Sequence, residues 1–209
     1  MRITHYGHAC LLVEIDGARI LFDPGTLSGG FEALTGLDAI LITHDHDDHL
    51  DREALDALAA ANPGAAIVAD TGSAAALEHL GVRSVTAGDR LDVAGVSIEV
   101  LGGAHAFVYH DIPSSPNAAY LVGDGAFLHG GDSYELPGCP VDVLAVPISG
   151  PWVKLGESIG YASAVAPRIA IPMHEAALSS TDQAHEMLAA FTPDSVQVRV
   201  LQRGIAAEV

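Results

Sequence analysis

Basic residues are scarce in this sequence: Lys and Arg number 9 against 27 Asp and Glu, and Lys154 is the single lysine. The net charge of −18 repels nucleic-acid phosphates and excludes attachment to acidic lipids through a basic cluster. Aromatic residues make up 5% of the chain, which leaves few platforms on which bases could stack. The composition therefore predicts a protein that binds neither nucleic acid nor membrane.

Cysteine and long apolar runs are also scarce. Cys10 and Cys139 stand in unrelated contexts and form no CxxC pair, so we expect small buried side chains rather than a disulfide framework. The first residues lack the apolar core of a signal peptide, and no apolar run approaches the roughly 18 residues needed to span a bilayer. These absences favour a cytoplasmic protein.

Histidine is abundant, with 11 residues, and it clusters in the segment HDHDDH at 44–49. This segment follows an apolar run typical of a buried strand and precedes a stretch with helical spacing. Side chains two positions apart on an extended chain project to the same side, so His44 and His46 can face one ion, and Asp48 and His49 can reach the same cavity. Imidazole and carboxylate are ligands of zinc, iron or manganese. A merely solvated polar loop accounts poorly for this clustering.

Three further residues of ligand type lie just past predicted strands. His105 follows a strand ending at residue 101, Asp132 follows one ending at 129, and His174 follows one ending at 171. Loops at strand ends commonly carry functional sites, although a single His or Asp in a loop is more often a surface residue. Their repeated position favours a shared site with the 44–49 segment.

Hydrophobic periodicity predicts a mixture of hairpins and helices. Strands are predicted at 2–6, 9–15, 18–23, 38–43, 65–69, 90–93, 96–101, 118–122, 126–129, 141–146, 168–171 and 196–201. Helices are predicted at 50–61, 73–80, 157–165 and 181–190. No linker is long enough to separate domains, so the pattern predicts one α+β or α/β domain with two sheets.

These motifs resemble the metallo-β-lactamase superfamily, whose H-x-H-x-D-H hallmark matches residues 44–49. The resemblance extends from Asp23 to His174, and the stretches at 6–8 and 129–133 look similar to a branch of small metal-dependent hydrolases related to ascorbate phosphate lactonases. It implies an α/β fold, a four-layer αββα sandwich of two mixed β-sheets flanked by helices. One such domain would span 1–209, with two similar halves at about 1–95 and 96–209.

The resemblance also implies a ligand set for two divalent metal ions. The first ion would be held by His44, His46 and His105, and the second by Asp48, His49 and His174, with Asp132 bridging them. Zinc is the first expectation for both ions, with manganese or iron as alternatives. Antibiotic-hydrolysing members of the main zinc type carry a cysteine at the position of Asp132, so antibiotic hydrolysis is not expected.

The function implied is a metal-dependent hydrolase that uses a metal-bridging hydroxide on a small ester, lactone or phosphoester, with Asp48 orienting the hydroxide. Two alternatives stay open: a mononuclear or dinuclear iron redox enzyme on the same scaffold, and a non-catalytic metal-binding domain. The expected partner is a small-molecule substrate, and a homo-oligomer is one alternative for the quaternary state.

Other side chains are candidates for supporting roles. Asp23 is our choice to accept a hydrogen bond from a metal-binding histidine, with a turn residue as the alternative reading. His8 and His129 are expected near the metals, and His110 could donate a proton, although each could be a structural histidine. The candidates for substrate contact are Tyr134, Trp152 and Lys154, against the alternatives of a packed tyrosine and a simple surface loop.

Overall fold

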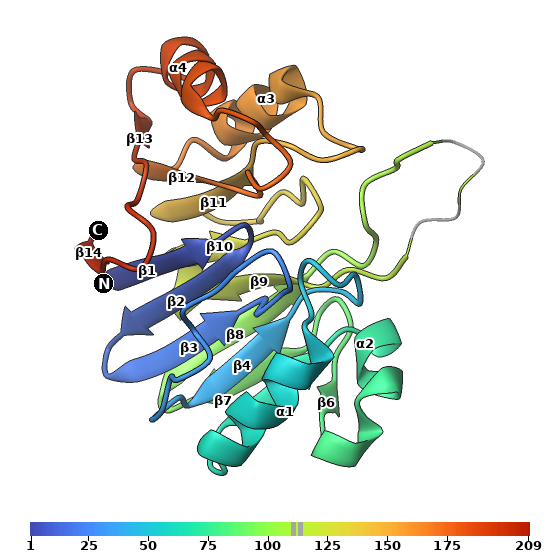
Figure 1. The fold of residues 1–209 in the computed structure, drawn as a ribbon. Helices are drawn as coiled ribbons and strands as arrows, with labels where there is room; N and C mark the ends of the chain where they lie inside the picture. Colours follow the sequence, from blue (N-terminus) through green and yellow to red (C-terminus); the bar gives the residue numbers. More distant parts are fainter. Residues whose placement is uncertain (110–111, 113–114) are drawn as a thin grey trace.

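The computed structural model describes residues 1–109, 112 and 115–209, which form two seven-stranded β-sheets (Figure 1). The first sheet has the order β14-β1-β2-β3-β4-β5-β6. Its strands are β1 (Arg2–Gly7), β2 (Cys10–Ile15), β3 (Ala18–Phe22), β4 (Ala39–Ile42), β5 (Ala66–Ala69), β6 (Arg83–Ser84) and β14 (Ala207–Glu208). Strand β3 pairs antiparallel with β2 and parallel with β4, so the sheet is mixed.

The second sheet repeats this arrangement in the order β13-β12-β11-β10-β9-β8-β7. Its strands are β7 (Arg90–Val93), β8 (Val96–Leu101), β9 (Ala119–Val122), β10 (Phe127–His129), β11 (Val143–Pro147), β12 (Ile169–Met173) and β13 (Gln197–Val198). Strand β10 marks the change of direction, because it pairs antiparallel with β9 and parallel with β11. The expected α/β class with two mixed sheets is confirmed.

Four α-helices cover the outer faces of the sheets: α1 (Arg52–Ala61), α2 (Thr71–Ala76), α3 (Leu155–Val165) and α4 (Asp182–Phe191). The alternation of side chains along central strands explains the layers. On β4, Leu41 points into the core between the sheets, whereas Ile40 and Ile42 pack with residues of α1. Because both faces of such a strand are covered, its sequence is apolar throughout.

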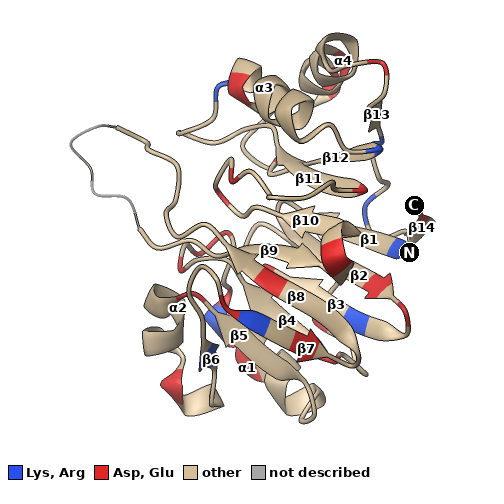
Figure 2. Cartoon of the chain, turned by 180° about the vertical axis from the view of Figure 1, so that it is seen from behind, with Lys and Arg blue, Asp and Glu red and all other residues tan. Residues whose placement is uncertain are grey.

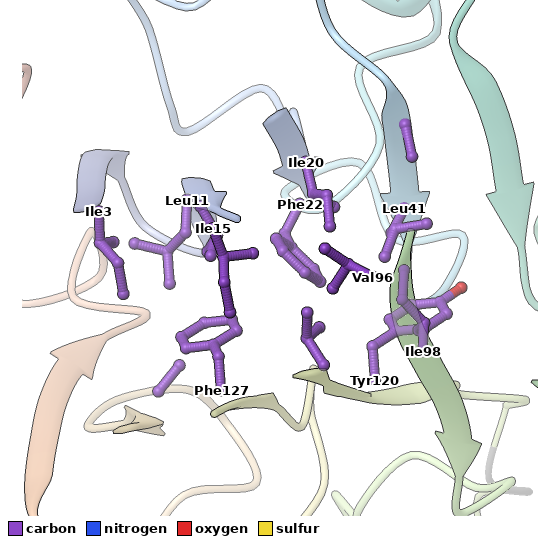
Figure 3. Packing of buried hydrophobic residues seen from close by; sticks show 14 of the residues in the cluster. Ile3, Leu11, Ile15, Ile20, Phe22, Leu41, Val96, Ile98, Tyr120 and Phe127 are labelled. Atoms are coloured by element: carbon purple, nitrogen blue, oxygen red, sulfur yellow. The ribbon is translucent and has the colours of Figure 1, made fainter. Parts of the chain in front are cut away.

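The largest core lies between the sheets (Figure 3). Phe22 of β3 meets Phe127 of β10 edge-on, with ring centroids 5.5 Å apart. Tyr120 of β9 is fully buried in the same core, and its hydroxyl donates a hydrogen bond to the Ile42 carbonyl at 2.8 Å. This bond ties the second sheet to the end of β4, directly before the histidine-rich segment.

Several element boundaries differ from the sequence prediction. The predicted helix at 73–80 is divided into α2 and a 3₁₀ turn, η1 (Glu78–Leu80), and the connection between β9 and β10 is a second 3₁₀ turn, η2 (Gly123–Gly125). The predicted strand at 196–201 is only two residues long, since the chain then leaves β12 and crosses to β1. Over the described residues, no helix is both long enough and apolar enough to traverse a bilayer.

Candidate metal centre

Loops that follow β1, β4, β8, β10 and β12 bring the predicted ligand residues together. They form two groups in which every potential ligand atom lies within 4.8 Å of the others. The first group is His44, His46, His105 and Asp132, and the second is His8, Asp48, His49 and His174. The groups therefore match the two predicted ligand sets, with His8 added to the second.

Asp132 lies between the two groups and faces both. Its Oδ1 is 3.1 Å from His49 Nε2 and 3.2 Å from His174 Nε2. Its Oδ2 is 3.1 Å from His105 Nε2 and 3.9 Å from His44 Nε2. A carboxylate with one oxygen toward each group has the geometry that a shared ligand requires.

The buried polar atoms of the centre show that these residues fit metal ions. His49 Nε2, His174 Nε2 and Asp132 Oδ1 are buried and lack a hydrogen-bond partner of proper geometry among the described residues, although they face one another. Leaving such groups unsatisfied costs about 1–3 kcal/mol each. A cation at this point would satisfy all three, and the nitrogen and oxygen donors suit zinc, manganese or iron.

The comparisons with known proteins find relatives described as metal-dependent hydrolases. A family model described as "Beta-lactamase superfamily domain" matches residues 2–174. "Protein Rv0786c" of Mycobacterium tuberculosis is 47% identical over 180 residues, which cover 84% of each chain. A UPF0173 metal-dependent hydrolase of Carboxydothermus hydrogenoformans is 31% identical over 196 residues, covering 83% of this chain and 84% of the relative.

This chain belongs to the metallo-β-lactamase superfamily. Within it, the chain is a member of the UPF0173 family of metal-dependent hydrolases. Among solved structures, the metallo hydrolase Igni18 of Ignicoccus hospitalis superposes with a TM-score of 0.78 over 100% of this chain and 98% of that chain, at 20% identity. That likeness shows the shared fold.

In this superfamily member, Asp23 supports the centre by accepting hydrogen bonds from Thr43 and His49. It is fully buried, and its Oδ2 accepts hydrogen bonds from the Thr43 hydroxyl and from His49 Nδ1, each at 2.7 Å. Its Oδ1 accepts the Thr43 backbone N–H at 2.8 Å. The Thr43 hydroxyl in turn lies 3.0 Å from His44 Nδ1. Asp23 and Thr43 thereby leave the Nε2 atoms of His44 and His49 directed at the two groups.

His8 and His129 are both buried, but they lie at different places relative to the centre. His8 Nδ1 accepts the Ala176 backbone N–H at 3.3 Å, so its Nε2 carries the proton and donates to Asp48 Oδ2 at 3.0 Å. His129 uses both nitrogens on the backbone, at 3.0 Å from the Ala9 carbonyl and 3.2 Å from the Gly131 N–H. His8 thus contacts a candidate ligand directly, whereas His129 anchors the loop that carries Asp132.

Electrostatics of the metal-free centre follow from this packing. Burial alone would lower the pKa of His49, but Asp132 and Asp23 raise that pKa well above its ordinary value. Burial alone would raise the pKa of Asp132, but His49, His105 and His174 hold it well below its ordinary range. Burial also dominates at His44 and lowers its pKa well below the usual value. Positive charge on His49 therefore balances Asp132 when no cation is bound.

Trp152 and Tyr134 lie beside the centre, because the Trp152 indole bonds to Asp132 and the Tyr134 ring packs against the indole. Tyr134 and Trp152 line a cavity of about 410 Å³ with Ser133, Glu135 and Glu157. Lys154 does not line it: its side chain is 84% exposed and pairs with Glu157 at 3.4 Å. His110 lies outside the described residues.

A second cavity, of about 540 Å³, is lined mainly by apolar side chains, among them Ile148, Val153 and Met187. Ser149 lines this cavity, and its hydroxyl donates a hydrogen bond to the His174 carbonyl. In Figure 2, the positions of acidic residues (red) are spread over the fold, and those of basic residues (blue) are few. Among the residues that the structure describes, no Lys or Arg lines either cavity.

Gly25 allows the closest backbone approach at the centre. A Cβ at this position would lie 1.9 Å from the Asp48 carbonyl oxygen and 2.1 Å from its carbon. We therefore expect Gly25→Ala to displace Asp48 and His49, to lower metal content, and to reduce the free energy of unfolding by about 2 kcal/mol. Denaturant unfolding and metal analysis measure both effects.

Gly64→Ala is the matched control for Gly25→Ala, because a Cβ at Gly64 would meet nothing within 4 Å. This control should retain both stability and metal. If Gly25→Ala behaved like Gly64→Ala in both measurements, the described contact between the Gly25 and Asp48 backbones would be wrong.

Proposed function

We propose that this protein is a dinuclear metal-dependent hydrolase acting on small esters or lactones. The observation that carries the proposal is the position of Asp132, with one carboxylate oxygen toward each ligand group. His44, His46 and His105 would hold one divalent ion, and Asp48, His49 and His174 the other. Bound ions of this kind activate water as a nucleophile and polarise the scissile group.

Asp48 is the residue we assign to the attacking water. Its side chain is 28% exposed, whereas Asp132 is only 3% exposed. The His8 contact fixes Asp48 Oδ2, and burial, which alone would raise the pKa of Asp48, is outweighed by His8, His49 and His174, which lower it to about 2. Asp48 is therefore ionised at neutral pH and can orient the water by accepting a hydrogen bond from it.

The charge of the cavities favours an uncharged substrate over a phosphoester. Phosphate recognition commonly uses Arg or Lys, and neither lines the two cavities among the described residues. Glu135 and Glu157 line the smaller cavity and would repel an anion. The larger cavity offers Ile148, Val153 and Met187 to an apolar group of the substrate.

Metal analysis combined with a substrate screen tests the function. Protein purified without chelators should contain two equivalents of zinc or manganese and should hydrolyse uncharged esters or lactones. We expect kcat/KM for such substrates to exceed that for phosphodiesters by at least about tenfold, equivalent to about 1.4 kcal/mol. Absence of hydrolysis with zinc, manganese and iron would refute the proposal, and iron-dependent oxygen consumption would support the redox alternative instead.

Metal affinity is expected to increase with pH. His49 carries a proton in the metal-free protein at neutral pH, because its raised pKa lies well above 6.5, and a metal ligand must be neutral. For each proton released on binding, the metal affinity should therefore rise about tenfold per pH unit at pH values below that pKa. Titration calorimetry between pH 6 and 8, in buffers with different ionisation heats, counts the protons.

The contribution of His49 to the stability of the metal-free protein should show the opposite trend. A raised histidine pKa stabilises the fold fully below the unfolded value of 6.5, and this stabilisation is lost as pH rises through the folded pKa. In chelator-treated protein, the difference in unfolding free energy between the wild type and His49→Asn should therefore be smaller at pH 9 than at pH 6. Metal affinity independent of pH would contradict the protonation of His49.

A further inference from the structure

The chain's one tryptophan makes a direct hydrogen bond to the carboxylate between the two ligand groups. Trp152 lies in the loop between β11 and α3, and its side chain is 6% exposed. Its indole Nε1–H donates to Asp132 Oδ2 at 2.8 Å. Sequence reasoning placed Trp152 at the substrate and missed this contact.

The surrounding residues hold the indole in this orientation. The Tyr134 ring meets it edge-on at 5.3 Å between centroids, and the His105 ring meets it edge-on at 5.6 Å. Gly150 leaves the space that the indole nitrogen occupies, because a Cβ there would lie 3.1 Å from Nε1. Packing against Tyr134, His105 and Gly150 therefore holds the indole in the orientation that the bond to Asp132 requires.

Two side-chain nitrogens reach Asp132 Oδ2, His105 Nε2 at 3.1 Å and the Trp152 indole nitrogen at 2.8 Å, and they differ in whether they can ligate a cation. His105 Nδ1 lies 2.6 Å from the Ala106 carbonyl and donates to it, which leaves Nε2 as the nitrogen that would bind a cation. The indole nitrogen is a donor only and cannot ligate a metal. The Trp152 bond is thus compatible with both the metal-free and the loaded centre.

We infer that Trp152 is a positioning residue, which holds the Asp132 carboxylate with one oxygen toward each ligand group. This inference rests on the proposed metal centre. Without the indole N–H, the carboxylate can rotate and place both oxygens on one side of the centre. Outer hydrogen-bond partners of metal ligands typically contribute 10–100-fold to metal affinity, and we expect a loss in that range.

Because Trp152 is the single tryptophan, biosynthetic replacement changes this site alone. The probe is 3-benzothienylalanine, which keeps the size of the indole but has sulfur in place of N–H. Zinc affinity, measured by competition with a chromophoric chelator, should fall about 10–100-fold while the thermal unfolding temperature is retained. Trp152→Phe should show a loss of similar size and serves as the second variant if the analogue does not fold.

Tyr161→Phe is the matched control, since it removes a buried aromatic donor that bonds to the Glu135 carbonyl at 3.0 Å and not to a candidate ligand. This control should lower stability and leave zinc affinity unchanged. The single indole N–H resonance in a ¹H–¹⁵N spectrum should shift in Asp132→Asn and persist after zinc is added.

The outcomes separate this inference from the proposed function. If the wild-type protein binds no divalent metal, the metal centre itself is wrong. If the wild-type protein binds zinc and the benzothienyl protein binds it equally well, the centre stands and the role of Trp152 is overturned. Loss of the indole resonance by rapid exchange on zinc addition would likewise overturn it.

Discussion

Replacing Asp132 by Asn is expected to lower the kcat/KM of the metal-treated protein at least about 1000-fold, because metal activation supplies several kcal/mol and each 1.4 kcal/mol is tenfold. The substitution keeps the shape of the side chain but removes its charge. The two carboxylate oxygens of Asp132 face His49, His174 and His105, so loss of the charge affects both ligand groups at once. Steady-state kinetics and metal content measure the effect.

Asp47→Asn is the matched control for Asp132→Asn. Asp47 belongs to the same acidic and histidine-rich segment, but its side chain is 78% exposed and pairs with Arg52. The control should keep both metals and activity, whereas His105→Ala should behave like Asp132→Asn. Two retained metals and activity within about tenfold of wild type would remove Asp132 from the centre.

Replacing Asp23 by Asn is expected to lower the free energy of unfolding by about 3 kcal/mol, because breaking a buried charged pair leaves its partners uncompensated. The carboxylate accepts hydrogen bonds from His49 and from both the backbone and the hydroxyl of Thr43. Asn is the appropriate substitute, since Asp23 has φ +42° and Asn tolerates this left-handed region better than Ala does. Denaturant unfolding of chelator-treated protein isolates this effect from metal binding.

Asp16→Asn provides the control for backbone conformation. Asp16 also has a left-handed φ, of +49°, but it is exposed in the turn between β2 and β3. Its substitution should change stability by less than about 0.5 kcal/mol. Equal stability of Asp23→Asn and Asp16→Asn would show that Asp23 is a turn residue and not a hydrogen-bond acceptor that supports the centre.

The ligand positions could be predicted because they depend on local signals. Apolar runs locate the ends of the strands, and His105, Asp132 and His174 follow those ends at short distances. The dense segment at 44–49 follows β4 as expected. Local periodicity and motif spacing thus indicate that these residues lie at strand ends, whereas their division into two ligand groups was implied by the resemblance to the superfamily.

The contacts around the ligands could not be predicted, because they depend on pairing between distant segments. Thr43 reaches Asp23 only because β4 lies beside β3, with Leu41 opposite Phe22. The Trp152 indole reaches Asp132 through the packing of a loop whose residues allow many orientations. Lys154, the residue before α3, is exposed and pairs with Glu157, as the alternative of a simple surface loop describes.

Boundary errors have a similar origin. The predicted helix at 73–80 is interrupted at Leu77, whose fully buried side chain fixes the direction of the chain there. Strand β14 was not predicted, because it is only two residues long, shows no periodic pattern and is defined by its pairing with β1. Tertiary pairing decided both outcomes against the local pattern.

The two sheets contribute comparably to the ligand groups: His8 and the 44–49 segment follow strands of the first sheet, while His105, Asp132 and His174 follow strands of the second. Ions held there would link the two sheets, because each sheet supplies ligands to them. By mass action, free metal at about 100 times its dissociation constant would add about 2.7 kcal/mol to the free energy of unfolding. The supply of metal would then govern the lifetime of the folded chain as well as its chemistry.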